Sequence, residues 1–296
     1  MRVIPVVDLQ SGRVVHARRG MRQAYAPVRS ALCHQPDPVQ VVQQLCRHAG
    51  APCVYAADLD ALAGLPVQTA VLRALYAAVP GLQLWLDAGW TDGAAARSLA
   101  TALGVPLGVP LGMPLGMPAG LPAGMLPGMP PITRPAGGLP CATAGLPAGG
   151  VLRPAADVPP LPRPLPGPVL CPVFGSESLR EAAVLDTLPP QALLSLDRRD
   201  GRAMDPAGVW ARPAQWPSQL IVMTLERVGA DLGPDLDTLA AVRAAAGPQR
   251  RLIGAGGVRG LDDLRAAAAA GASAWLVASA FHDGRLPPGL GLGLPP

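Results

Sequence analysis

The sequence predicts an α/β fold, a TIM (β/α)8 barrel with a long low-complexity Pro/Gly-rich insert between its third and fourth strands. Eight short apolar segments recur along the chain, and most are followed by a segment with helical periodicity. The apolar segments are continuous rather than alternating, which is typical of strands buried on both faces of a parallel sheet. Eight such units favour a closed barrel over an open sheet.

The expected strands are each five to seven residues long. They cover residues 3–9, 53–58, 82–87, 169–174, 193–197, 220–224, 251–255 and 274–278. The helix signals are clearest around residues 38–49, where Asp37 caps the first turn, Pro38 takes the first helical position and Gly50 ends the helix. Further helices are expected over residues 67–79, 91–103 (capped by Thr91), 178–188, 234–246 and 261–270.

The chain therefore divides into four parts. Residues 1–103 and 169–285 form the barrel, residues 104–168 form the insert, and residues 286–296 form a tail of Pro, Gly and Leu only. Insert and tail are expected to be disordered, because nothing in either organises turns or a core. The alternative for the insert is a partner-docking segment.

No full eighth helix is expected before the tail. The ring of outer helices should then have a gap, and the sequence predicts a homo-oligomer or a partner subunit that covers it.

Composition excludes several function classes. The net charge is +4, the arginines are scattered and aromatic residues make up 3% of the chain, so nucleic-acid binding is not expected. The chain contains no lysine, so Schiff-base chemistry on a lysine is excluded. Residues 98–133 carry no charge, but recurring proline argues against a membrane span.

The five cysteines have neither C-x-x-C nor zinc-ligand spacing. We expect free thiols in a reducing cytoplasm, no signal peptide, no metal and no cofactor.

Acidic residues end several of the expected strands, and in this fold the carboxyl ends of the strands carry the active site. Asp8 and Asp197 follow strands on opposite sides of a barrel, where two carboxyls can divide acid and base roles between them. We predict that both are catalytic. Asp58, Asp60 and Asp87 also end strands, but capping of the next helix is an equally good interpretation for them.

Small residues end the last two strands, which favours a phosphate site. Glycine lets backbone N–H groups approach phosphate oxygens closely. The predicted substrate- and phosphate-binding residues are Arg19, Gly175, Ser176, Thr224, Gly256, Gly257, Ala278 and Ser279. Arg19 is the expected second anion anchor, with a solvated surface charge as the alternative. His16 is interpreted as an ordinary polar residue, with a contact to the substrate as the alternative.

Several of these segments resemble the HisA/HisF family of histidine biosynthesis. The likeness rests on the opening stretch of residues 2–15, on 57–61 (ADLDA), on 195–202 (SLDRRDGR), on 254–258 (GAGGV) and on 275–281 (WLVASAF). HisA is a ribotide isomerase that performs an Amadori rearrangement without a cofactor, and HisF is the related cyclase. The resemblance implies that Asp8 is the general base and Asp197 the general acid that opens the ribose ring.

The sequence departs from the family pattern at two strand ends. Asp87-Ala88-Gly89-Trp90 stands where the family has a glycine-rich turn, and Val228 stands where the isomerase has aspartate. The resemblance therefore implies a divergent HisA-like isomerase of a phosphorylated ribosylamine. The alternatives are a HisA-like enzyme of one-carbon cofactor (methanopterin-type) biosynthesis and a non-catalytic barrel that serves as a binding or assembly subunit.

Overall fold

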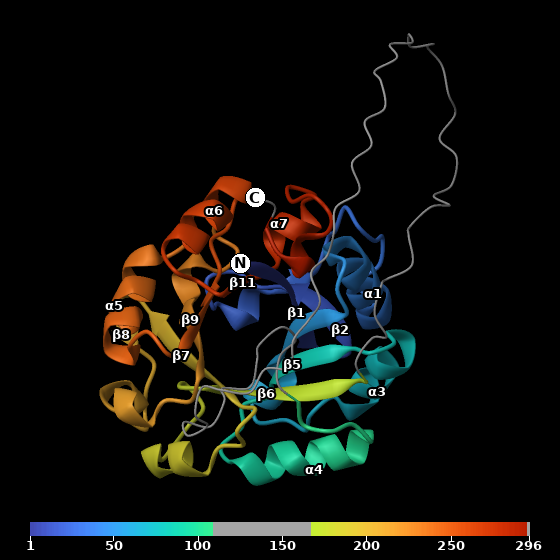
Figure 1. The fold of residues 1–296 in the computed structure, drawn as a ribbon. Coiled ribbons are helices and arrows are strands. Elements are labelled where there is room, and N and C mark those ends of the chain that lie inside the picture. The colour runs from blue at the N-terminus through green and yellow to red at the C-terminus, as the bar shows by residue number, and fades with distance from the viewer. Residues whose placement is uncertain (109–166, 295–296) are drawn as a thin grey trace, which may run out of the picture. The chain divides into compact units, whose positions relative to one another are not determined.

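The computed structural model describes residues 1–108 and 167–294, and within them a closed parallel barrel is formed (Figure 1). The strand order is β1–β4–β5–β6–β7–β9–β10–β11, and β11 pairs in parallel with β1 to close the sheet. The eight strands are β1 (Arg2–Gln10), β4 (Cys53–Asp58), β5 (Gln83–Asp87), β6 (Val169–Gly175), β7 (Leu193–Arg199), β9 (Gln219–Thr224), β10 (Arg251–Ala255) and β11 (Ala274–Val277). The predicted fold class is confirmed.

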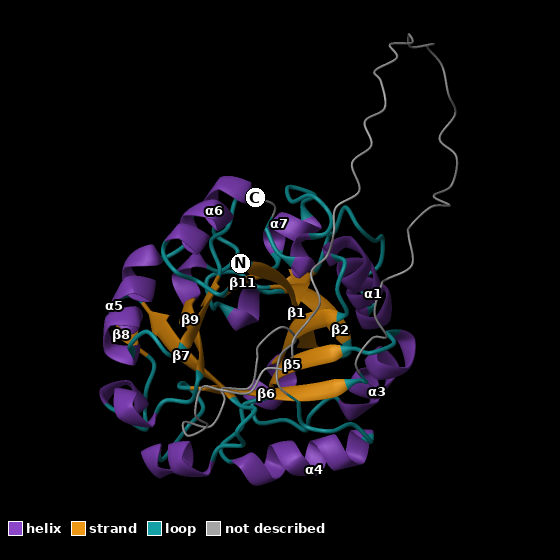
Figure 2. Ribbon diagram, viewed as in Figure 1, coloured by secondary structure: helices purple, strands orange, loops and turns teal. Residues whose placement is uncertain are grey.

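The strands are buried on both faces because two hydrophobic cores enclose them. Inside the barrel, side chains such as Tyr55, Trp85 and Ile253 pack in one cluster. Outside, the other faces of the same strands pack against the helices in a larger cluster that includes Leu45, Leu75 and many others. Figure 2 shows these helices arranged around the strands. Every residue of β4 and β5 is buried, which explains why these strands read as continuous apolar runs.

The helices begin and end largely where the sequence signals place them. They are α1 (Pro38–Ala49), α2 (Leu59–Leu62), α3 (Thr69–Ala78), α4 (Gly93–Leu103), α5 (Leu236–Ala246), α6 (Leu261–Ala269) and α7 (Ser279–His282). Asp37 caps α1 and Gly50 ends it with a left-handed conformation. The cap predicted for α4 is wrong by one residue, because the Asp92 carboxylate accepts from the backbone N–H of Ala94 and Ala95.

The helix predicted over residues 178–188 is also wrong in type and extent. A 3-10 helix, η2 (Ala182–Thr187), occupies its second half. The sequence continues into Pro189-Pro190, and a proline restricts the residue before it to extended conformations. Leu188 accordingly has ψ of 141° and cannot extend a helix.

Two hairpins lengthen the barrel strands beyond the predicted ends. β2 (Arg13–His16) pairs antiparallel with β1, β3 (Ala26–Pro27) pairs with β2, and β8 (Arg202–Ala203) pairs with β7. Each of the two tight turns has two consecutive residues with positive φ, Ser11-Gly12 and Asp200-Gly201. Such turns match the twist of the flanking strands and favour Asp or Asn followed by Gly. The remaining short 3-10 helices are η1 (Arg22–Ala24), η3 (Val209–Ala211), η4 (Pro213–Gln215), η5 (Leu225–Arg227) and η6 (Leu290–Leu292).

The tail is the main correction to the expected domain organisation, because residues 286–294 are not disordered. η6 packs against β1 and α1, and Leu286 and Leu290 are buried in the outer core. The backbone N–H of Gly289 donates to the His48 carbonyl, and the Arg2 guanidinium donates to the Gly291 carbonyl. As expected, α7 is only four residues long, and the tail covers part of the barrel side next to α1.

The predicted insert lies mainly outside the described residues. At its edges, residues 106–108 bond to β6 through Leu170, whose backbone N–H donates to the Pro106 carbonyl. Cys33, Cys46, Cys53 and Cys171 are free thiols, whereas Cys141 is not among the described residues. None of the helices within residues 1–108 and 167–294 combines the length and apolarity needed to cross a membrane.

Replacement of Leu290 by Ala should destabilise the protein by about 2–4 kcal/mol, because it leaves a cavity where a fully buried leucine packs. Leu292, two residues away, is 69% exposed and provides the matched control, for which Leu292→Ala should change stability by less than about 0.5 kcal/mol. Chemical denaturation measures both. Equal effects of the two variants would contradict the packed tail.

Candidate active site

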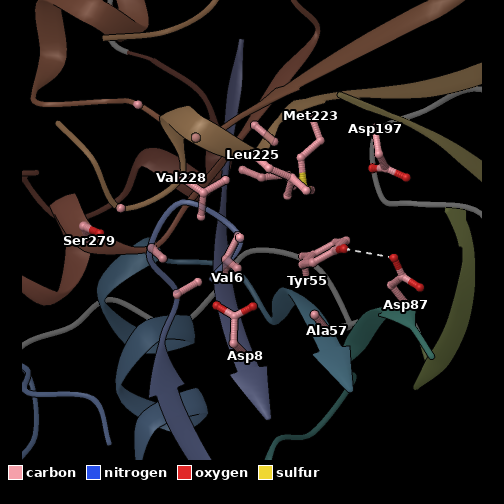
Figure 3. A pocket seen from close by; sticks show the side chains of 18 of the residues that line it. Val6, Asp8, Tyr55, Ala57, Asp87, Asp197, Met223, Leu225, Val228 and Ser279 are labelled. Atoms are coloured by element: carbon pink, nitrogen blue, oxygen red, sulfur yellow. Dashed lines mark hydrogen bonds between the residues drawn. The ribbon is translucent and has the colours of Figure 1, made fainter. Parts of the chain in front are cut away.

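A pocket opens at the carboxyl ends of the barrel strands, where the fold brings all eight strand ends together (Figure 3). Its lining differs in character around the mouth. Carboxyl groups come from β1, β5 and β7 and from the loops after β6 and β9, and glycines come from the loops after β9 and β10. These residues are Asp8, Asp87, Asp197, Glu177, Asp231, Gly229, Gly256 and Gly257.

Asp8 lies near the end of β1 and extends its carboxyl group into the pocket (Figure 3). The hairpin with β2 fixes its backbone, which pairs with Val15 on one side and with Ala57 of β4 on the other. The carboxyl has no hydrogen-bond donor among residues 1–108 and 167–294. Burial raises the pKa of Asp8 to about 7, and the nearby Arg22 guanidinium opposes this rise. Asp8 can therefore exchange a proton near neutral pH.

Asp197 lies on β7, across the barrel from β1, and is 5% exposed. Its carboxyl accepts from the Ser195 hydroxyl at 2.6 Å, from the Ser176 hydroxyl at 3.3 Å and from the Glu177 backbone N–H at 3.4 Å. Burial raises the pKa of Asp197 to about 8, and the negative charges of Glu177 and Asp87 add to the rise. The hydrogen bonds to the carboxylate act in the opposite direction but do not offset burial.

Asp87 at the end of β5 is a third buried carboxyl in the same pocket. From the sequence alone, a role in this site and capping of the next helix were equally good interpretations of Asp87. It accepts from the Gly89 backbone N–H at 3.1 Å and, in a long contact of 3.5 Å, from the Tyr55 hydroxyl. Burial raises the pKa of Asp87 to about 7. By contrast, Asp58 caps α2 by accepting from the Ala61 N–H, and Asp60 accepts from Ser11.

The segment between β2 and β3 lines the pocket and is held there by arginines. Arg22 forms an ion pair with Glu177, and the Arg199 guanidinium donates to the Gly20 carbonyl at 3.0 Å. Sequence reasoning missed Arg22, Glu177 and Arg199, since partners about 150 residues or more apart leave no local signal. The Arg22 guanidinium lies near Asp8 and Asp87, and its charge lowers the pKa of both carboxyls.

The opposite side of the pocket offers backbone donors. Gly256 and Gly257 both have φ of +81°, and a Cβ on Gly257 would lie 2.0 Å from the Gly233 carbonyl oxygen, so glycine is required there. Ala278 and Ser279 line the pocket beside them. The backbone N–H groups of Gly257, Ala278 and Ser279 have no acceptor within the described part of the chain. Unpaired donors of this kind suit phosphate oxygens.

The profile of the family described as "Histidine biosynthesis protein" matches residues 2–105 and 212–287, more than half of the chain. The chain belongs to this family. An uncharacterised protein of Methanocaldococcus jannaschii is 36% identical over 64 residues, which represent 22% of this chain and 28% of that protein. The family match includes Asp8, Asp87 and the glycine loop after β10, whereas Glu177 and Asp197 lie outside the matched residues.

Four of the predicted substrate- and phosphate-binding residues of this histidine-biosynthesis family member are not among the residues that line this pocket, namely Arg19, Thr224, Gly175 and Ser176. Arg19 is exposed and lines a separate pocket, and its backbone N–H donates to the Val228 carbonyl. The Thr224 hydroxyl donates to the Asp235 carboxylate, which caps α5. Gly175 and Ser176 lie against Asp197 and so shape the carboxyl side.

His16 lies at the edge of the pocket. His16 Nε2 lies 3.0 Å from the hydroxyl of Ser279, which lines the pocket, and burial lowers the pKa of His16, so its ring is neutral at pH 7. Within residues 1–108 and 167–294, no three His, Cys, Asp or Glu side chains are placed to share a metal ion.

Asp8→Asn should raise the melting temperature by a few degrees at pH 8 and leave it unchanged at pH 4. The folded pKa of about 7 lies above the unfolded value of about 3.9, so the folded protein keeps a proton that the unfolded chain releases. Stability from Asp8 is therefore complete below about pH 4 and is lost as the pH rises through about 7.

Thermal unfolding of wild type and variant between pH 4 and 9 measures this difference. Asp262→Asn, which removes a carboxylate exposed on α6, is the matched control and should show no such trend. A constant difference between wild type and Asp8→Asn across this range would contradict the burial of the Asp8 carboxyl.

Proposed function

We propose that the protein is an isomerase that performs an Amadori-type aldose–ketose rearrangement on a phosphorylated ribosylamine. The observation that carries the proposal is the pair Asp8 and Asp197. The two carboxyls enter one pocket from opposite strands of the barrel, and their environments differ. Asp8 lacks hydrogen-bond donors among the described residues, whereas Asp197 is enclosed by them.

The rearrangement needs one acid and one base on opposite sides of the sugar. A proton donated to the ring oxygen opens the ribose and leaves a protonated imine at C1. A base then removes the proton from C2 to give an enaminol. A proton added to C1 and loss of the proton from the C2 hydroxyl give the aminoketose, so that no atom is gained or lost. Asp197 is assigned as the acid and Asp8 as the base, in agreement with what the family likeness implies.

The electrostatics support this division of roles. A pKa of about 8 keeps Asp197 largely protonated at neutral pH, as an acid requires. A pKa of about 7 leaves Asp8 about half ionised at the same pH, and its carboxylate is then available as a base. The unpaired backbone donors at Gly257, Ala278 and Ser279 are assigned to the phosphate of the substrate.

A second candidate is a HisA-like enzyme of one-carbon cofactor (methanopterin-type) biosynthesis. Val228 and Asp87 both line the pocket, and both lie at strand ends where the sequence departs from the pattern of the ordinary isomerase. These differences favour another phosphorylated substrate with the same acid–base pair. A non-catalytic assembly subunit is the third hypothesis, and it requires neither carboxyl.

Asp8→Asn and Asp197→Asn should each lower the turnover number by about 10²–10⁴-fold, because each removes a general acid or base. The first assay is complementation of a histidine auxotroph that lacks the isomerase, with Asp262→Asn as the surface control. Growth with wild type and control but with neither pocket variant is expected. Equal growth with all four proteins would overturn the roles of Asp8 and Asp197, and failure of the folded wild type would favour the second candidate.

The pH dependence of kcat/KM should be bell-shaped. Activity should rise as the base ionises near pH 7 and fall as the acid ionises near pH 8. Because the two carboxyls share one pocket, the two apparent pKa values belong to the pair. Steady-state kinetics from pH 5 to 10 provides the measurement, and a profile that is flat across this range would contradict the assignment.

A further inference from the structure

A histidine lies directly behind the proposed phosphate site, which consists of the backbone N–H groups of Gly257, Ala278 and Ser279. Ser279 follows β11 and lies well apart from Asp197 in Figure 3. His16 is the last residue of β2 and is partly buried, and its Nε2 lies 3.0 Å from the Ser279 hydroxyl oxygen. His16 is not among the described residues that line the pocket, so it can act on a ligand there only through Ser279.

The hydrogens on the His16 ring decide what the Ser279 hydroxyl can offer to a ligand. A hydroxyl has one hydrogen to donate, and a phosphate dianion can only accept. If Nε2 carries no hydrogen, it accepts the hydroxyl hydrogen of Ser279, and only lone pairs remain for the ligand. If Nε2 carries a hydrogen, it donates to Ser279 Oγ, and the hydroxyl hydrogen stays available for a phosphate oxygen. The charged ring and one of the two neutral tautomers meet this condition.

The fixed charges around His16 balance one another, so the charge of its ring sets the net charge behind the phosphate site. Two aspartates and one arginine act on the ring, and a second arginine is shared between the two aspartates, at 2.9 and 2.7 Å. These residues are Arg18, Asp231, Asp283 and Arg285. His282 of α7 also faces His16, but burial lowers the pKa of His282 to about 4, so it is neutral above pH 5.

A bound phosphate would change the proton affinity of His16. Without a ligand the ring is neutral at pH 7, because burial and the charge of Arg18 lower its pKa. A dianion one hydroxyl group away attracts the positive form of the ring, and partial burial weakens the screening of this attraction by water. Binding of the dianion and protonation of His16 would therefore strengthen each other by the same factor.

We propose that His16 is a positioning residue of the phosphate site: its Nε2–H holds the Ser279 hydroxyl with the hydrogen directed to the substrate phosphate, and phosphate binding brings a proton onto the His16 ring. This role rests on the proposed function, because it requires the phosphate site assigned there. It goes beyond that function by giving the site a positive charge, which the backbone donors lack, and a dependence on pH.

The first test follows the His16 ring of the wild-type protein by NMR. The chain has four histidines, and the His16 signal is the one that His16→Gln removes. The probe is sulfate, which stays a dianion from pH 5 to 9, whereas a phosphate ester changes its own charge near pH 6. Compared with chloride at equal ionic strength, sulfate should move the titration of His16 to higher pH and leave that of the exposed His34 unchanged.

Two substitutions separate the hydrogen bond from the charge. Gln can place an amide N–H where His16 Nε2 lies but never becomes charged, whereas Leu removes both properties. At pH 8, His16→Gln should bind ribose 5-phosphate within about twofold of wild type, and His16→Leu should bind it about fivefold more weakly. In the Ser279→Ala background, His16→Leu should have no further effect at this pH. Isothermal titration calorimetry measures these affinities, with ribose as the probe that lacks phosphate.

The pH dependence tests the charge. Between pH 8 and 5.5, wild type should gain about fivefold more affinity for sulfate than His16→Gln gains. Only this difference counts, because three pocket carboxyls titrate in the same range and also affect an anion; they are Asp8, Asp87 and Asp197. His34→Gln, on the exposed histidine, is the matched control and should behave as wild type.

The outcomes distinguish this role of His16 from the proposed function. If ribose 5-phosphate binds no more tightly than ribose, the phosphate site fails, and with it both the proposed function and the role of His16. If it binds more tightly, but sulfate leaves the His16 titration in place and His16→Gln keeps the pH dependence of wild type, the phosphate site survives and His16 is an ordinary polar residue. Neither result depends on His16→Leu, so a failure of that variant to fold leaves the test intact.

Discussion

Parallel hydrogen bonding between β1 and β11 closes the sheet, and the site depends on that closure. An open sheet of the same strands would leave its first and last strands far apart, and Asp8 on β1 would lie far from Ser279, which follows β11. In the closed barrel, residues that are 271 positions apart in the chain line one pocket. The barrel interior beneath is filled by side chains such as Trp85 and Ile253, so that the pocket has a solid floor.

The packed apolar core beneath the pocket raises the pKa values of the carboxyl groups above it. A carboxyl placed above a packed apolar core loses hydration and holds its proton more strongly, and Asp8, Asp87 and Asp197 all have raised pKa values for this reason. The same burial costs stability at neutral and alkaline pH, because each carboxyl is easier to ionise in the unfolded chain. The buried carboxyls at the strand ends therefore lower stability, but they also provide groups that exchange protons near pH 7.

Two glycines allow groups to approach closely around the pocket, each for a different reason. At Gly175 the missing side chain leaves room for two carboxyls. At Gly257 the positive φ and the contact with the Gly233 carbonyl exclude any other residue, and the backbone itself becomes part of the pocket wall. One side of the mouth therefore presents side-chain acceptors and the other side presents backbone donors, and a substrate with unlike ends would bind in one orientation.

The sequence by itself determined the barrel, the order of its strands and the residues at their ends. Strand burial on both faces produces continuous apolar runs, and Asp8, Asp197, Gly256 and Gly257 follow such runs directly. Only the tertiary structure decided how these residues are used. The pairing of Arg22 with Glu177, the proximity of Asp87 to Asp197 and the packing of Leu290 join residues far apart in the chain. Local patterns record the conformation of a segment and the face it buries, whereas charge pairing, proton affinity and tail packing depend on distances that exist only after the sheet has closed.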